Sequence, residues 1–393
     1  MAAGNSRQLY INFDEYQRQG EPSRREAAYA WATAIGLQAV DGLTTSAYLH
    51  QLARRNIEGE ISIDEVQQLA RSYYESRRAH DENNEDKEEA DRVSANIVKV
   101  LAQPTFAFNT NGFISIHRRI FDGVFKHAGR LRDYDITKKE WVLGGDTVQY
   151  LNWEDLRRAL DYDLAQEREF DYTRLAAVEF CSHLSRFVSG LWQIHPFSEG
   201  NTRATAVFTI QYLRYLGFAV DNDLFEKHSW YFRNALVRAN YSNYNLKVNR
   251  TTKFLELFFR NLIFGEQNEL RNRYLLIEQL QPDNYTPTGT PTGTPTSTPT
   301  STPTSEVPQH FNSVNELVVN LIKVIGKEEL SIKEILARAN LRDRKNLFDY
   351  HLKPAIETGF VRLKFTDKPS HPRQKYLLTV KGLMMYNQLI TNI

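Results

Sequence analysis

A polar stretch at 195–203 constrains the fold more than any other part of this chain. It reads His-Pro-Phe-Ser-Glu-Gly-Asn-Thr-Arg and stands between two apolar runs at helical spacing, over 175–191 and 206–216. Gly217 ends the second run. The pattern therefore predicts a tight loop between two buried helices, with Gly200 at the N-terminus of the second one.

The N-terminus of that second helix has the composition of an anion site. It opens with Gly200, Asn201 and Thr202, and the first N–H groups of a helix have no partner within it and lie at the positive end of its dipole. A phosphate chain is the usual occupant of such a site. Arg203 follows directly and can donate two parallel hydrogen bonds to a phosphate.

Two other residues of the loop carry reactive groups. Glu199 suits Mg²⁺, which proteins hold with one or two carboxylates together with phosphate oxygens. His195 is the natural proton acceptor for a hydroxyl that attacks a phosphate. Fragments such as His-Pro-Phe are usually structural, whereas the whole string between two apolar helices is not expected by chance. We therefore predict a site for phosphate chemistry.

The complete string resembles the signature of the Fic family, His-x-Phe-x-[Asp/Glu]-Gly-Asn-Gly-Arg-x-x-Arg. The resemblance implies transfer of AMP from ATP to a Ser, Thr or Tyr hydroxyl of a target protein, with His195 as base and Glu199 on Mg²⁺. Two positions depart from the signature. Thr202 replaces a frequent Gly, and Ala206 replaces the second Arg, which is associated with the γ-phosphate. The orientation of the triphosphate therefore stays open.

A β-prone segment before the loop predicts a hairpin. Residues 136–143 and 147–150 read as two strands, and 144–146 supply a Gly-rich turn. By resemblance this is the Fic flap, which holds the target segment as an added strand; a purely structural hairpin is the alternative. The flap residues that we expect to meet the target are Ile136, Thr137, Lys138 and Lys139.

Behind the loop, 230–240 reads as an aromatic-led helix, and 251–280 as a long amphipathic run that closes the bundle. The first of these resembles the Fic helix that borders the nucleobase, which makes Tyr231 and Asn240 candidates for that role. Aromatic residues at helical spacing are more often part of the core, so both interpretations stay open.

The first 92 residues predict a helical, antitoxin-like regulatory segment. In regulated Fic proteins an inhibitory helix carries [Ser/Thr]-x-x-x-Glu-[Gly/Asn], whose Glu pairs with the second Arg. The preferred match here is Asp41-Gly42, with Leu37 in place of the hydroxyl residue, and a simple helix C-cap is the alternative. Glu58-Gly59 is a second candidate. The charge run over 80–91 reads as solvated.

The end of the chain predicts a separate domain. A Thr/Pro repeat over 285–305 cannot bury surface and reads as a solvated linker. After it come helical segments over 314–324, 331–336 and 343–357, where Pro354 is expected to kink or divide the last one, and then two strands over 360–365 and 374–379. This order resembles a winged helix-turn-helix domain. The fourteen Lys or Arg against nine Asp or Glu over 306–393 fit DNA contact, but a protein-interaction or dimerisation wing fits nearly as well.

We therefore expect a mainly α fold, a Fic-type helical bundle with a β-hairpin flap followed by a winged-helix α+β domain. At 393 residues the chain has room for these parts. The predicted boundaries are 1–92 for the regulatory segment, 93–281 for the Fic domain, 282–307 for the linker and 308–393 for the winged helix.

Composition narrows the function further. A net charge of +1 argues against a globally basic nucleic-acid binder, and one cysteine, Cys181, excludes a disulfide framework. Without a long apolar run, a soluble cytoplasmic protein with no membrane contact is expected, and a homodimer is left open. Two functions remain, a protein adenylyltransferase and a DNA-binding regulator that senses nucleotide without transfer. His195 favours the first, because sensing needs no base, and Ala206 favours the second.

Overall fold

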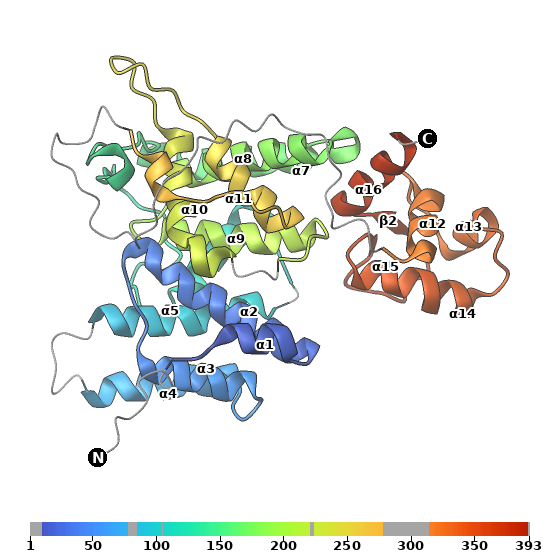
Figure 1. Cartoon of the computed structure of the whole chain (residues 1–393), viewed down its shortest axis with the longest axis horizontal. Helices are drawn as coiled ribbons and strands as arrows, with labels where there is room; N and C mark the ends of the chain where they lie inside the picture. Colours follow the sequence, from blue (N-terminus) through green and yellow to red (C-terminus); the bar gives the residue numbers. More distant parts are fainter. Residues whose placement is uncertain (1–9, 78–84, 104, 221–223, 278–313, 392–393) are drawn as a thin grey trace.

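The structure is a computed structural model that describes residues 10–77, 85–103, 105–220, 224–277 and 314–391. Helices build nearly all of it, in a large body and a smaller C-terminal domain (Figure 1). The predicted linker lies outside the described residues. Within the described ranges, no helix combines the length and the apolar character that a membrane crossing needs.

The N-terminal part of the body is a group of four helices that packs on a fifth (Figure 1). Ser46 caps the third helix, and Ser62 forms a capping box with Glu65 at the fourth. The bounds are α1 (Phe13–Gln19), α2 (Pro22–Gly36), the 3₁₀ helix η2 (Leu37–Asp41), α3 (Ala47–Ile57), α4 (Ile63–Arg77) and α5 (Glu85–Leu101).

The remaining helices of the body surround the predicted loop. As expected, one buried helix ends at Ile194 and the next begins at Asn201, and every residue of the latter from 201 to 213 is buried. The bounds are α6 (Thr110–Ile120), η5 (Trp153–Asp155), α7 (Leu156–Glu169), η6 (Tyr172–Arg174), α8 (Ala177–Ile194), α9 (Asn201–Tyr215), α10 (Leu224–Asn240), α11 (Lys253–Phe264) and η7 (Asn272–Leu275).

Two helices end earlier than the apolar pattern that continues beyond them. The helix α6 ends at Ile120, and 121–129 form turns. The amphipathic run over 251–280 is helical only to Phe264, where Gly265 takes a left-handed conformation that ends it. In each case the later apolar residues still face the core, but from irregular backbone.

The predicted hairpin at 136–150 does not form regular strands. The chain reverses there around a 3₁₀ helix, η4 (Trp141–Leu143), and the Glu140 N–H donates to the Asp146 carbonyl across the reversal at 2.9 Å. Val142 and Leu143 are fully buried, and the buried Glu140 forms an ion pair with Arg233 at 2.8 Å. Because these side chains point into the core, the backbone over 140–143 turns inward and does not follow an extended strand.

The C-terminal domain has its own hydrophobic core and the predicted order of elements. The long helical stretch is divided ahead of Pro354, as expected, since proline has no N–H to continue the ladder. A final helix that the sequence pattern did not predict closes the domain. The bounds are α12 (Glu316–Ile325), α13 (Ile332–Arg338), α14 (Arg344–Asn346), the π-helix η10 (Leu347–Leu352), α15 (Lys353–Glu357), β1 (Val361–Leu363), β2 (Tyr376–Leu378) and α16 (Val380–Thr391).

The strands β1 and β2 pair antiparallel, with Val361 opposite Leu378. The prediction of a mainly helical fold is therefore confirmed. Of the two predicted hairpins, the one in the C-terminal domain forms regular strands, and within the described ranges the one over 136–150 does not.

A close contact joins the C-terminal domain to the body. A methyl group on Gly217 would lie 2.1 Å from the Gly359 carbonyl oxygen, so only glycine lets the two backbones meet. The Lys381 N–H donates to the Leu216 carbonyl at 3.2 Å, and the Asn387 amide donates to the Thr173 carbonyl at 2.7 Å. The unpredicted helix α16 thus contributes two of these contacts.

Candidate active site

The loop between α8 and α9 is closed by its own asparagine. The Asn201 amide donates to the Phe197 carbonyl at 2.7 Å, and its oxygen accepts from the Phe197 N–H at 2.9 Å. The side chain predicted to bind phosphate therefore holds the loop in shape. Only the Asn201 backbone N–H is left to serve an anion at the helix start.

His117 supports the same loop from α6. Its Nδ1 accepts from the Gly129 N–H at 2.9 Å, which leaves Nε2 protonated to donate to the Glu199 carbonyl at 3.0 Å. Its ring stacks on Phe197 with centroids 3.7 Å apart. Burial lowers the pKa of His117 to about 3, so the ring is neutral at pH 7 and keeps this tautomer.

Arg132 holds the end of α8, a role that sequence reasoning missed. The side chain is almost fully buried, and its Nε donates to the His195 carbonyl at 2.8 Å. The same guanidinium donates to the carbonyls of Tyr134 and Leu151. A single arginine in a polar segment gives no sequence signal for such a clamp.

His195 lies at the C-terminus of α8 with a left-handed backbone, φ 49°. Its side chain is 3% exposed, and the Tyr150 ring covers it with centroids 4.0 Å apart. Burial, followed by the nearby charges of Lys138 and Arg132, holds the pKa of His195 well below its usual range. Neither ring nitrogen has a hydrogen-bond partner among the described residues. The imidazole is therefore neutral at pH 7 and able to accept a proton.

Glu199 faces a lysine of the predicted flap. Its carboxylate forms an ion pair with Lys138 Nζ at 2.8 Å, and its side chain is 55% exposed. Within the described ranges no three His, Cys, Asp or Glu residues cluster to hold a metal ion. One carboxylate fits Mg²⁺ only together with phosphate oxygens, and Lys138 must then withdraw. Of the other flap candidates, Thr137 and Lys139 are exposed and Ile136 is half-buried.

The N-terminus of α9 is capped by a glycine, so no capping side chain competes for the N–H groups of its first turn. Gly200 has φ 75°, and a methyl group there would lie 2.1 Å from the Phe121 ring. The Thr202 hydroxyl accepts from the Trp192 indole N–H at 3.0 Å, which fixes it to α8. The expected anion site is therefore compatible with threonine in place of the family glycine.

Arg203 is bound by the N-terminal helices. Its guanidinium is 2% exposed and pairs with Asp41 at 2.8 Å and with Glu89 at 2.7 Å. It also donates to Gln38 at 2.9 Å and lies over the Phe121 ring. Asp41 was expected beside a second arginine that this chain lacks, and instead it contacts the first one. Contact of Arg203 with a phosphate stays a prediction that requires this cluster to open.

The interpretation of the charge run as solvated is wrong for two of its acids. Glu89 is one of the two partners of Arg203, and Asp91 is 1% exposed. Asp91 accepts hydrogen bonds from the hydroxyls of Ser46 and Tyr74 at 2.5 and 2.6 Å. Both acids lie on α5, where charge density on the sequence gave no sign of their burial.

Tyr231 and Asn240 make contacts with neighbouring helices. Tyr231 is 1% exposed, and its hydroxyl donates to the Phe254 carbonyl at 3.2 Å. The Asn240 amide donates to the carbonyls of Ser189 and Leu236. These bonds join α10 to α11 and to α8, and the nucleobase role of both residues stays a prediction.

Comparison with known proteins finds family matches over two segments of the chain, and the first of them contains the loop at 195–203. Residues 107–213 match the Fic/DOC family, and residues 316–379 match the Filamentation induced by cAMP protein Fic-like, C-terminal domain. The chain is 28% identical over 139 residues to "Protein adenylyltransferase VbhT" of Bartonella schoenbuchensis, which is 35% of this chain and 27% of that protein. It is 29% identical over 118 residues to "Probable protein adenylyltransferase Fic" of Escherichia coli K12, 30% of this chain and 55% of that protein.

The matched segments thus span about a quarter and about half of these relatives. A crystal structure of a Fic family protein from Desulfovibrio desulfuricans G20 aligns with 94% of this chain and 91% of its own, at 16% identity and a TM-score of 0.41. The loop at 195–203 lies inside the first matched region, so the chain carries a Fic/DOC family domain over 107–213, followed by a Fic-like C-terminal domain over 316–379.

Proposed function

We propose that this protein is an adenylyltransferase that transfers AMP from ATP to a Ser, Thr or Tyr hydroxyl of a target protein. One observation carries the proposal: a buried, neutral histidine stands directly before a glycine-capped helix N-terminus. His195 can take the proton of the attacking hydroxyl while the first turn of α9 holds the phosphates. The names of the two relatives support the same chemistry.

The residues around the loop serve that reaction by holding it. Arg132 fixes the His195 carbonyl, and His117 fixes the Glu199 carbonyl, so the base and the acid keep their relative place. When bound, Mg²⁺ would neutralise phosphate charge, and Glu199 is the residue that would hold it. The target would enter along 136–150, where exposed backbone can pair with an extended segment.

The contacts of Arg203 support regulation by the N-terminal helices. Asp41 and Glu89 neutralise a guanidinium that a phosphate would otherwise attract. We infer that ATP binds with full strength only after these carboxylates release Arg203.

Labelled ATP tests the proposal. The purified protein is incubated with [α-³²P]ATP, Mg²⁺ and cell lysate, and labelled proteins are separated by electrophoresis. Transfer predicts label on a protein band, lost in His195→Ala. His183→Ala is the matched control, because this histidine lies on α8 but pairs with Glu167 away from the loop. Nucleotide binding without label on any protein, the enzyme included, refutes transfer.

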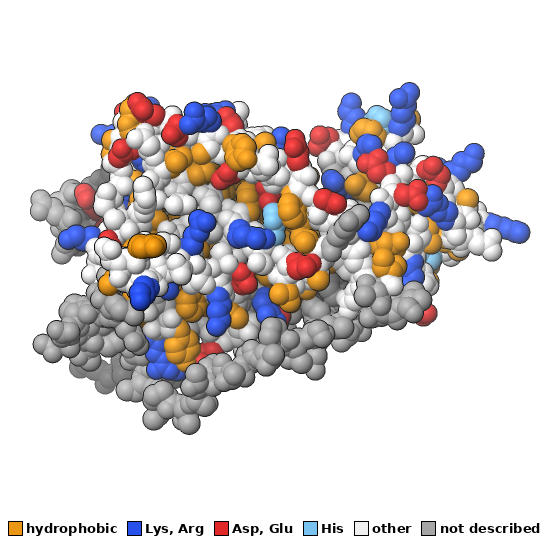
Figure 2. Space-filling view, turned by 90° about the horizontal axis from the view of Figure 1, so that it is seen from above, with side chains coloured by type: hydrophobic (Ala, Val, Ile, Leu, Met, Phe, Trp, Pro, Cys, Tyr) orange, Lys and Arg blue, Asp and Glu red, His pale blue; other side chains and the backbone are white. Residues whose placement is uncertain are grey.

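The alternative, a nucleotide-sensing DNA-binding regulator, is favoured by the C-terminal domain. We interpret its helices and the β1–β2 hairpin as a winged helix, with Arg344 and Lys345 exposed where the third helical stretch begins. Figure 2 shows Lys and Arg side chains projecting from this domain, at the right, mixed with Asp and Glu. A mobility shift of the full chain on mixed DNA at low salt decides: no retardation removes this function.

A further inference from the structure

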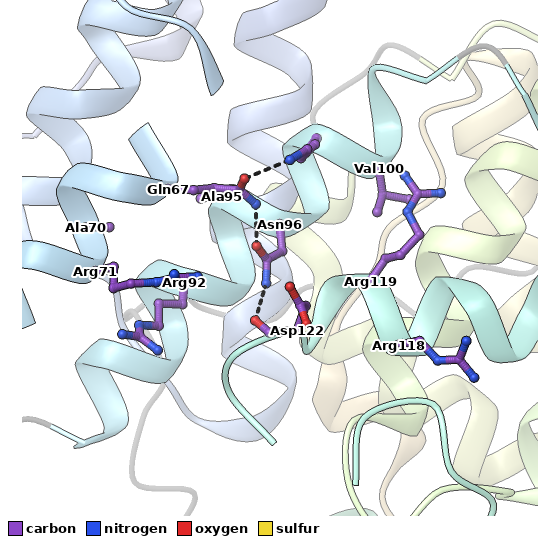
Figure 3. A pocket seen from close by; sticks show the side chains of 11 residues that line it. Gln67, Ala70, Arg71, Arg92, Ala95, Asn96, Val100, Arg118, Arg119 and Asp122 are labelled. Carbon is purple, nitrogen blue, oxygen red and sulfur yellow. Dashed lines mark hydrogen bonds between the residues drawn. The ribbon is translucent and has the colours of Figure 1, made fainter. Parts of the chain in front are cut away.

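A pocket lies away from the loop at 195–203, where α4, α5 and α6 meet (Figure 3). Its volume is about 310 Å³, near the lower end for small-molecule sites. Basic side chains dominate its lining, with Asp122 as its one carboxylate. They are Arg71 from α4, Arg92 and Lys99 from α5, and Arg118 and Arg119 from α6.

Only some of these cations are neutralised by the protein. Arg92 pairs with Glu88 at 3.1 Å, and Lys99 pairs with Asp64 at 2.6 Å. Arg71, Arg118 and Arg119 form no ion pair with any residue that the structure describes. Three arginines of the lining therefore have no ion-pair partner within the described ranges, and Asp122 is the one carboxylate of the lining.

The Arg119 guanidinium has a buried donor that no described residue satisfies. Its Nη2 is buried and has no hydrogen-bond partner in the described part of the chain. Burial lowers the pKa of Arg119, and no neighbouring acid acts to raise it. A buried donor without a partner destabilises the folded chain, and an anion in the pocket would satisfy it.

The pocket is built to keep its shape. The Asn96 amide donates to the carbonyls of Ile120 and Asp122 at 3.1 Å, and its oxygen accepts from the Gln67 amide at 2.6 Å. This chain of bonds ties α4, α5 and the end of α6 together, so the three segments that carry the cations keep their spacing before a ligand arrives. Pre-organised donors bind with a smaller loss of conformational freedom.

The lining favours a polyphosphate over a single anion. In Figure 3 Arg71 and Arg92 lie on one side of Asn96, and Arg118 and Arg119 lie on the other. The planar guanidinium matches phosphate oxygens with two parallel hydrogen bonds. The lining contains no His, Ser, Thr, Cys or Tyr, and most of its polar side chains are cationic or amide donors, which suits binding of an anion.

We propose that this pocket binds a small ligand with two or more phosphate groups, at a site separate from the loop at 195–203. The pocket shares α5 with Glu89 and α6 with His117, which both contact the loop region. It is therefore placed as an effector site and not as a second active site.

Calorimetry of the full chain with inorganic tripolyphosphate tests the proposal. Arg119→Gln and Arg71→Gln should each weaken binding at least tenfold, since each removes a fork onto phosphate. Arg250→Gln is the matched control, an exposed arginine outside the pocket, and should change the affinity less than twofold. Thermal unfolding checks that the variants are folded.

Two results would overturn the proposal. One is the absence of tripolyphosphate binding to the unmodified chain at millimolar concentration. The other is unchanged affinity in both Arg119→Gln and Arg71→Gln, which would place the ligand on the loop. Should either variant fail to fold, the exposed Arg118→Gln replaces it, with the same tenfold loss expected.

Discussion

Replacing Asp41 with asparagine tests whether the N-terminal helices restrain the active site. In the structure Asp41 contacts the guanidinium of Arg203, which is almost fully buried. Asparagine keeps the size and removes the charge. The remaining partners of Arg203 are Glu89 at 2.7 Å and Gln38 at 2.9 Å. The perturbation therefore weakens the cluster without leaving the buried charge wholly unpaired.

The expected cost follows from burial. Stripping a buried charge of its partner costs about 3–5 kcal/mol. The Asp41 side chain is 30% exposed and Glu89 stays, so solvent screening and the second carboxylate reduce the loss to about 1–2 kcal/mol in the free energy of unfolding. The double variant with Glu89→Gln should lose more than the sum of the single changes, because Arg203 then keeps no carboxylate.

Asp41→Asn should also lower the free energy needed to release Arg203, and ATP should therefore bind more tightly. If Arg203 must leave Asp41 before it meets phosphate, lowering that cost by about 1–2 kcal/mol raises the apparent ATP affinity roughly five- to thirtyfold. Isothermal titration with a non-hydrolysable ATP analogue measures the affinity, and urea unfolding measures the stability. Label transfer from ATP to lysate protein should rise in parallel.

Glu58→Gln is the matched control. Glu58 lies in the same N-terminal region and pairs with Arg24 at 2.9 Å and with the Tyr16 hydroxyl at 2.6 Å, and it does not contact Arg203. Glu58→Gln should lower the free energy of unfolding of the chain without raising its ATP affinity. An Asp41→Asn protein that binds ATP no better than the unmodified chain, or a Glu58→Gln protein that gains as much, would show that the Arg203 cluster is only structural.

Three further outcomes follow from single contacts. Arg132→Lys should lower the rate of label transfer at least tenfold with little change in ATP affinity. The three carbonyls are reached by three different nitrogens of the guanidinium, and the single nitrogen of lysine cannot reach all three positions. His117 has a folded pKa of about 3 against the usual 6.5, so the unfolded chain binds more protons than the folded one between these values. The free energy of unfolding therefore falls as the pH drops below about 6.5. In urea unfolding between pH 6 and 4, His117→Gln should remove about 1.4 kcal/mol per pH unit from that slope. Gly217→Ala should lower the free energy of unfolding by about 2–4 kcal/mol, because the new methyl group meets the Gly359 carbonyl. Gly59→Ala is the control: Gly59 has a similar positive φ but open space around it, so the loss should be about 1 kcal/mol. Thermal unfolding measures both.

Local signals carried most of the correct predictions from sequence. The hydroxyl caps at Ser46, Ser62 and Ser331 mark helix starts because the capping bond closes within three residues. The helix–loop–helix around 195–203 is equally local, since apolar spacing and one glycine define it. Even Asp41 was found through a short motif, although its partner was not the expected one.

Contacts between distant segments could not be predicted. Arg203 meets Gln38 and Glu89, which are 165 and 114 positions away, and no spacing rule links such residues. The strands predicted at 136–150 do not form, for the same reason. Their β-prone composition is real, but the burial of Glu140 against Arg233 on α10 decides the backbone path. Tertiary partners outweigh local propensity at such places.

The two charged groups that would meet ATP and Mg²⁺ are already neutralised, but at unequal cost. The Lys138–Glu199 pair is solvent-exposed, and such pairs contribute only about 0–1 kcal/mol, so a divalent cation can displace the lysine easily. The Arg203 cluster is buried and holds two carboxylates and an amide around one guanidinium. Opening that cluster is therefore the costlier step. Control of this site should consequently lie with the segments that carry Asp41 and Glu89, and the flap lysine should set only how readily metal enters.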